Sequence, residues 1–145
     1  MKILILAVGK LKDVHVAALS DAYLSRMGGA VAVERVPDAR VAARDGPEIL
    51  RRLRPRDRLI LLSEDGAEYD SRAFASFLSR EVASAEGRVV FAVGGPWGVS
   101  ESVRQRADSL LSLSRMTFPH DLCFLFLTEQ IYRALTILDG GGYSH

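Results

Sequence analysis

The stretch Val89-Val-Phe-Ala-Val-Gly-Gly-Pro-Trp-Gly98 indicates the fold class. Its first five residues are apolar and mostly β-branched or aromatic, which is typical of a buried strand. Glycines and a proline end the strand, and Ser100-Glu-Ser-Val then opens a helix. In α/β proteins such a junction often binds a ligand, because glycine lets backbone groups approach it with no Cβ in the way. The spacing Gly-Gly-Pro-x-Gly matches neither the dinucleotide nor the phosphate-loop pattern, and a plain tight turn explains it equally well.

The rest of the chain alternates between expected strands and expected helices. Short apolar or alternating runs predict strands over residues 2–9, 31–37, 58–62, 88–93 and 110–114. Capping residues, glycine stops and apolar faces predict helices over residues 13–27, 47–53, 71–85, 100–107 and 121–138. This alternation favours a mostly parallel sheet with helices on both faces. We therefore expect an α/β fold in a single domain, residues 1–145.

The composition predicts a globular protein of a reducing compartment. The chain has 145 residues, 48% of them hydrophobic and 26% charged. Its one cysteine, Cys123, excludes an internal disulfide framework, fits the cytoplasm and is expected to be a buried filler. No run approaches the roughly 20 apolar residues of a membrane helix, and the apolar start of the chain predicts a strand rather than a signal peptide.

Positive charge is concentrated in one segment. The net charge of the chain is only +1, but residues 35–58 contain eight arginines against four acidic residues, a local net charge of +4. Such a segment can bind phosphates, or it can be the solvated face of a helix and loop.

The final helix predicts an interface. Residues 122–127 are apolar all round, so this helix is expected to bury surface against more than its own domain, most simply in a homodimer. Further along the same helix, Glu129 and Arg133 have the spacing of an intrahelical ion pair.

Three predicted strand ends point in the same direction: Leu61–Gly66, Val93–Gly98 and Leu113–His120. In a parallel sheet these loops gather at the carboxyl edge and can form one pocket. Backbone and apolar side chains would line it, which suits adenine and a thioether better than phosphates.

These features resemble the SPOUT class of methyltransferases and, within it, the small RlmH family. The resemblance covers nearly the whole chain, and its specificity lies in three motifs in order: the Gly-Gly-Pro-x-Gly turn, Leu113-Ser-Arg-Met-Thr-Phe-Pro-His120 and Glu129-Gln-Ile-Tyr-Arg-Ala134. It implies a deep trefoil knot in about residues 90–145. It also implies methylation of N3 of a pseudouridine in the helix 69 loop of 23S ribosomal RNA, on the ribosome or large subunit, by a cytoplasmic homodimer.

The resemblance also implies roles for particular residues. S-adenosylmethionine would lie against Leu62, Gly94 and the loop Leu113, Ser114, Arg115, Met116, Thr117 and Phe118; no metal is implied. Methyl transfer needs alignment of donor and acceptor and loss of the N3 proton. The candidates for that proton chemistry are His120, Arg133, Tyr143 and His145, although His120 can equally be a capping or packing residue. With the arginine-rich segment, the resemblance makes Arg51, Arg52 and Arg54 candidate RNA contacts.

The sequence departs from the family at two places. Most members carry an arginine where this chain has Phe124, and most end in Gly-x-Pro-Tyr-His-Lys/Arg, whereas this chain ends Gly140-Gly-Gly-Tyr-Ser-His145. A glycine tail without the terminal cation orders less readily over an RNA base. Two alternatives to an active methyltransferase therefore stay open: a non-catalytic RNA-binding module of the same fold, and a flavodoxin-like nucleotide-binding protein.

Overall fold

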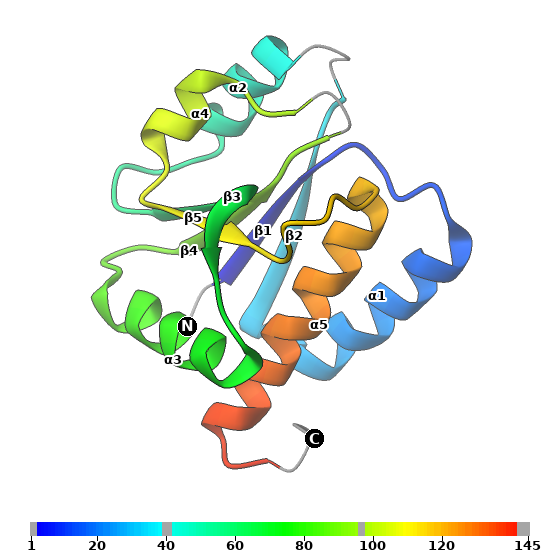
Figure 1. Ribbon diagram of the computed structural model, residues 1–145, viewed down its shortest axis with the longest axis vertical. Helices are drawn as coiled ribbons and strands as arrows, with labels where there is room; N and C mark the ends of the chain where they lie inside the picture. Colours follow the sequence, from blue (N-terminus) through cyan, green and yellow to red (C-terminus); the bar gives the residue numbers. More distant parts are fainter. Residues whose placement is uncertain (1–2, 39–41, 96–97, 142–145) are drawn as a thin grey trace.

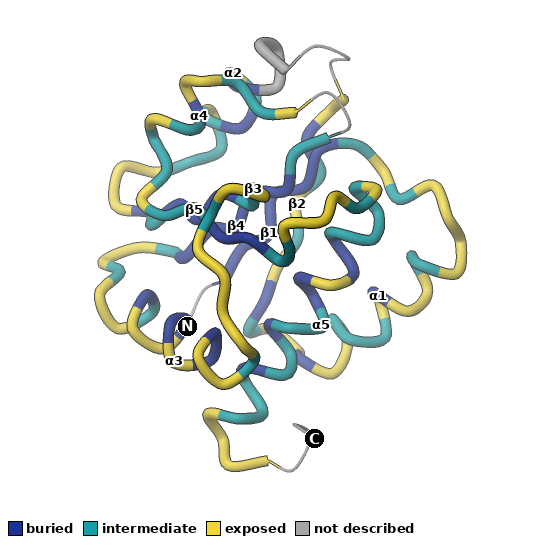
Figure 2. The backbone as a smooth tube through the Cα atoms, in the orientation of Figure 1, coloured by how far each residue is buried: buried dark blue, intermediate teal, exposed yellow. Residues whose placement is uncertain are grey.

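The computed structural model describes residues 3–38, 42–95 and 98–141, with the side chains of residues 42–45 left out. Its centre is one sheet of five parallel strands in the order β2-β1-β4-β3-β5. The strands are β1 (Ile3–Val8), β2 (Val31–Val36), β3 (Arg58–Glu68), β4 (Val89–Val93) and β5 (Ser109–Ser112). Every residue of β1 and β4 is buried, as expected for strands covered on both faces (Figure 2).

Helices cover both faces of this sheet (Figure 1). One face carries α1 (Val14–Met27), α3 (Ser71–Ser84) and α5 (His120–Leu138); the other carries α2 (Ala42–Arg51) and α4 (Glu101–Arg106). A single 3-10 turn, Gly28–Ala30, links α1 to β2. Alternate strand residues divide between two cores: Ile5 and Phe91 face α5, whereas Leu6 and Val90 face α2 and α4. The predicted parallel α/β architecture is confirmed, and the trefoil knot stays a prediction.

Helix α2 begins earlier than the sequence predicted. The prediction placed a loop over residues 38–45 and a helix start at Pro47, whereas Pro47 lies inside a helix that starts at Ala42. Proline usually marks the first turn of a helix because it lacks an N–H. The longer helix is accompanied by a tertiary contact. A Cβ on the buried Gly46 would collide with the side chain of Ser100, just before α4. The glycine therefore permits a close approach of α2 to the start of α4.

Strand β3 extends beyond the predicted end at Leu62. The segment after Leu62 bulges out and returns, so that both Leu62 and Ala67 pair with Leu111 of β5. Gly66 makes this return possible, because a Cβ there would lie 2.6 Å from the backbone carbon of Leu110. The predicted Ser63–Gly66 turn is thus a bulge within one long strand.

Helix α5 is covered mainly by its own domain. Phe124, Leu125 and Leu127 are buried against α1, α3 and the sheet, and Phe126 is 37% exposed. Most of residues 122–127 are therefore covered within one chain, and the expectation that they need a second subunit to be covered was wrong. The homodimer itself stays a prediction. No helix among the described residues is long and apolar enough to cross a membrane.

Candidate functional site

A cleft of about 650 Å³ opens at the carboxyl edge of the sheet. Its walls come from the ends of β3, β4 and β5 and from the start of α5. The lining includes these predicted cofactor contacts: Leu62, Gly94, Leu113, Ser114, Met116, Thr117 and Phe118. Arg115 does not line the cleft; its side chain is 86% exposed and lies 3.5 Å from Glu68. The structure therefore brings together seven of the eight predicted contacts.

The glycine turn after β4 is shaped by contact with its own chain. A Cβ on Gly94 would lie 2.6 Å from Cγ2 of Val99, so any side chain there must displace the valine. Gly95 and Gly98 form an isolated bridge, and Gly98 has a φ of 82°, a conformation that favours glycine. Backbone and small apolar groups therefore form this wall, which suits a flat heteroaromatic ring.

The opposite wall is a loop held by short-range bonds. Ser112 donates to the carbonyl of Ser114 at 2.9 Å, and the Ser114 hydroxyl accepts from the N–H of Met116 at 3.0 Å. Cys123 also lines the cleft and is half-buried, and burial raises the pKa of its thiol. A thiol held protonated is a poor nucleophile, which agrees with its predicted role as a filler.

His120 is the titratable candidate that faces this cleft. It is the first residue of α5, and its Nε2 lies 3.1 Å from Oδ1 of Asp121. The other carboxylate oxygen of Asp121 accepts the backbone N–H groups of Lys12 and Asp13, at 2.9 and 3.2 Å. Asp121 thereby bonds to the loop that follows β1 and lies beside His120. The sequence pattern predicted Asp121 only as a helix start, and its acidic first-turn position was the one signal of this role.

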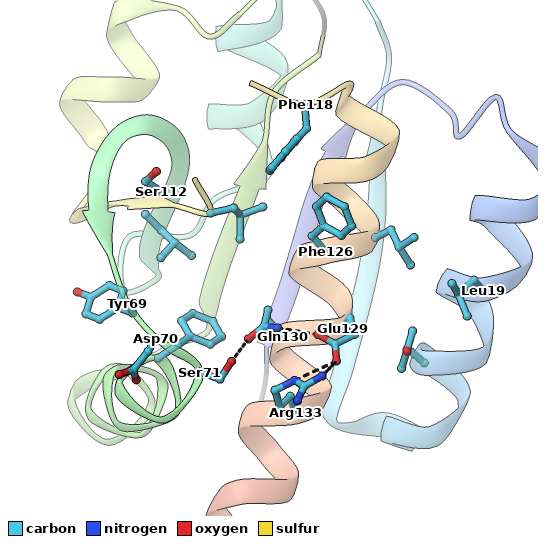
Figure 3. A pocket seen from close by; sticks show the side chains of 15 residues that line it. Leu19, Tyr69, Asp70, Ser71, Ser112, Phe118, Phe126, Glu129, Gln130 and Arg133 are labelled. Carbon is cyan, nitrogen blue, oxygen red and sulfur yellow. Dashed lines mark hydrogen bonds and ion pairs between the residues drawn. The ribbon is translucent and has the colours of Figure 1, made fainter. Parts of the chain in front are cut away.

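Arg133 lies in a second hollow, the α5 groove, of about 750 Å³ (Figure 3). The groove is bounded by α1, α3, β5 and α5 and meets the cleft at Leu111, Leu113 and Phe118. The guanidinium of Arg133 donates to Glu129 at 2.6 and 3.0 Å, which confirms the predicted intrahelical pair. Thirteen residues of helix, roughly 20 Å, separate Arg133 from His120. The structure does not bring these two candidates together within one chain, and Tyr143 and His145 lie outside the described residues.

Comparison with known proteins agrees with this geometry. The model of the family described as "Predicted SPOUT methyltransferase" matches residues 1–145. The chain belongs to the SPOUT methyltransferase family. Proteins named ribosomal RNA large subunit methyltransferase H are similar over their whole length. The one from Porphyromonas gingivalis is 42% identical and that from Bacteroides thetaiotaomicron 36%, each over all of this chain and 99% of the relative. The one from Oleidesulfovibrio alaskensis is 37% identical over 97% of both chains.

Phe124, where the resemblance led us to expect an arginine, is packed internally in this SPOUT chain. Phe124 is buried, and the guanidinium carbon of Arg35 lies 4.3 Å from the centre of its ring. Burial lowers the pKa of Arg35, while the carboxylates of Asp121 and Asp21 act in the opposite direction. A cation from β2 therefore lies beside Phe124.

The three predicted RNA-contacting arginines lie at the other edge of the sheet. Arg51 ends α2 and Arg52 follows it, and both form ion pairs with Glu48, at 3.0 and 2.9 Å. Arg54 lies in a hollow beside the start of β3 and β4, where its backbone N–H donates to Asp57 at 2.8 Å. The strands place this hollow roughly 17–20 Å from the cleft. Among the described residues, no group of three or more metal-ligating side chains occurs.

Proposed function

We propose that this protein is a methyltransferase that uses S-adenosylmethionine and acts on large-subunit ribosomal RNA. The main structural support for this proposal is the cleft at the carboxyl edge of the sheet, where Leu62, Gly94 and the loop after β5 meet. Its walls offer backbone groups and apolar side chains, which suit an adenine ring and a thioether. The names of the full-length relatives supply the substrate class.

We propose further that the acceptor is N3 of the pseudouridine in the helix 69 loop of 23S ribosomal RNA, in the assembled ribosome or large subunit. The bound donor would supply a sulfonium methyl group, so the protein has to align the acceptor and favour loss of its proton. His120 is the candidate beside the cleft. A near-neutral chain has few phosphate contacts of its own, which favours a preformed particle over free RNA.

We also infer a homodimer in the cytoplasm, with the α5 groove near the subunit interface. The support is the apolar rim of this groove, where Leu19 is 46% and Phe126 37% exposed. A second subunit would also let Arg133 of one chain approach the cleft of the other, whereas within one chain roughly 20 Å of helix separates Arg133 from His120. We propose that the tail of one chain lies near the cofactor of the other.

Two assays test the function. Calorimetry should detect binding of S-adenosylmethionine, and failure to bind would leave a nucleotide-binding protein of another kind. Purified protein with ribosomes from a strain lacking it should then transfer a methyl group to the pseudouridine, read by mass spectrometry of the nucleoside. Cofactor binding without transfer would favour the non-catalytic RNA-binding module.

A further inference from the structure

We propose that the β1–α1 loop, residues Gly9–Asp13, is a contact surface for RNA backbone phosphates beside the cleft. The inference rests on the proposed function and names where the substrate touches the protein. Lys10 and Lys12 would each contact a phosphate.

The loop is attached to the site by Asp121. This carboxylate accepts the N–H groups of Lys12 and Asp13, and its second oxygen lies 3.1 Å from Nε2 of His120. Since His120 lines the cleft, a phosphate on Lys12 would be a close neighbour of a base held there. In Figure 1 the chain leaving β1 passes beside the start of α5 before it enters α1.

The charges of the loop are available to a ligand. Lys10 and Lys12 are both exposed, and within residues 3–38, 42–95 and 98–141 neither ammonium has an ion-pair partner. The nearby acids are engaged differently: Asp13 accepts from His15 and Val16 as the cap of α1, and Asp121 accepts from the loop itself. Asp38 is a third acid near the loop, since a Cβ on Gly9 would lie 3.7 Å from the Cβ of Asp38.

The loop is also held in one conformation. The N–H of Gly9 donates to the carbonyl of Val36 at 2.7 Å, and Arg35 donates to the carbonyl of Gly9 at 3.4 Å. Leu11 packs on the core between the two lysines. A preorganised backbone loses little entropy when a ligand binds, so two ammonium groups fixed in this way can recognise a phosphate spacing.

Chain composition makes the inference testable by chemistry. The protein has three lysines, at positions 2, 10 and 12, and uses arginine at every other basic position apart from histidine. Among side chains, amine-directed acetylation followed by mass spectrometry therefore reports on Lys2, Lys10 and Lys12. Ribosomes should protect Lys10 and Lys12, whereas inorganic phosphate alone should not.

The decisive variant is Lys10→Gln with Lys12→Gln. Loss of two phosphate contacts should raise KM for ribosomes roughly tenfold. The fall of log affinity with log salt should become less steep, its slope decreasing in magnitude by about 2. The affinity for S-adenosylmethionine should not change. The matched control is Arg72→Gln with Arg80→Gln, which removes the same charge from exposed positions on α3 and should change KM less than about twofold.

The outcomes separate this inference from the proposed function. If wild-type protein methylates ribosomes while the lysine variant keeps its KM and salt slope, the loop is not an RNA contact and the function stands. Equal losses in both double variants would reveal only general electrostatic attraction, and protection of the lysines by inorganic phosphate alone would indicate a free-phosphate site; each result would overturn the inference. If wild-type protein transfers no methyl group, the proposed function fails first, and the acetylation pattern on ribosomes still decides whether the loop contacts RNA.

Discussion

At Gly94, a single added side-chain carbon would disturb the wall of the cleft. Its neighbour Val99 leaves no room for a Cβ, since the two atoms would be 2.6 Å apart. A side chain at this position would therefore both intrude on the cleft and displace Val99. The physical requirement for glycine comes from the protein's own packing as well as from a ligand.

We expect Gly94→Val to abolish binding of S-adenosylmethionine in calorimetry. Because Val99 must move, the variant should also lose about 1–3 kcal/mol in the free energy of unfolding. Gly29→Val is a suitable control, since no atom lies within 4 Å of a Cβ placed there. Wild-type affinity in the Gly94 variant would exclude this wall of the cleft.

Cys123 reports on the same cleft. Burial raises the pKa of its thiol, so the reactive thiolate is scarce at neutral pH and appears only as the pH rises well above the ordinary value. We expect alkylation at pH 8 to be at least about tenfold slower in the folded protein than in urea. Added S-adenosylmethionine should slow it further, and alkylation at the unfolded rate would show that the thiol is open to solvent.

At the scale of elements, the start of β3 is held to the start of β4 by a buried ion pair. Asp57 is fully buried at its side chain and accepts from Arg88 at 2.7 Å, and the backbone N–H groups of Arg54 and Arg88 donate to it as well. Burial alone would raise the pKa of Asp57, but these hydrogen bonds outweigh it and lower the pKa. The pair therefore fixes the connection between α2 and the sheet.

We expect Asp57→Asn to destabilise the protein by about 3 kcal/mol in urea unfolding, because Arg88 would remain buried without its counter-charge. A lowered folded pKa means that the stabilisation is present above the unfolded value of about 3.9 and is lost as the pH falls through the folded value. The unfolding free energy of wild type should thus fall more steeply below pH 4 than that of the variant.

The exposed pair of Arg56 and Glu86 provides the comparison. Its charged atoms are 3.6 Å apart, and both side chains are about three-quarters exposed. Glu86→Gln should change the free energy of unfolding by less than about 0.5 kcal/mol. An equal loss in both variants would contradict the special role of Asp57.

At the scale of the whole molecule, the predicted functional residues are distributed over three surfaces of one chain. The cleft and the α5 groove adjoin at Leu111, Leu113 and Phe118, whereas the hollow beside Arg54 lies at the other edge of the sheet. Within this chain, His120 and Arg133 lie roughly 20 Å apart along α5, so a site that used both side chains would need a second copy of the chain.

We expect sedimentation at micromolar concentration to show a species of about twice 15.9 kDa. Phe126→Glu, on the rim of the groove, should shift it to the monomer, whereas Val14→Glu, exposed outside the groove, should not. A monomeric wild type would exclude the homodimer.

Replacing Arg51, Arg52 and Arg54 by glutamine should weaken ribosome binding and leave the affinity for S-adenosylmethionine unchanged. We expect a smaller effect per charge than for the lysines of the β1–α1 loop, because Arg51 and Arg52 share an ion pair with Glu48, which offsets part of their charge. Filter binding at two salt concentrations would measure it. Unaltered binding would mean that this segment is only a solvated face.

The sequence alone was enough for the fold class and for most of the cleft. Strand runs such as Val89–Val93 bury nearly every residue, and a capping residue such as Asp13 starts its helix through bonds to its own next turn. Both signals are local, and parallel strands must bring their carboxyl ends to one edge. This is why Leu62, Gly94 and the loop after β5 could be predicted to meet.

Only the tertiary structure decided features that depend on contacts between distant segments. Pro47 lies inside α2, next to a glycine that permits close contact with Ser100, and β3 continues past Leu62, where Gly66 can touch β5. The same holds for Asp121, which bonds residues more than 100 positions away, and for the arginines at the opposite edge. Periodicity and capping describe neighbours along the chain, whereas the position of a charge relative to a cleft is set by how the elements pack.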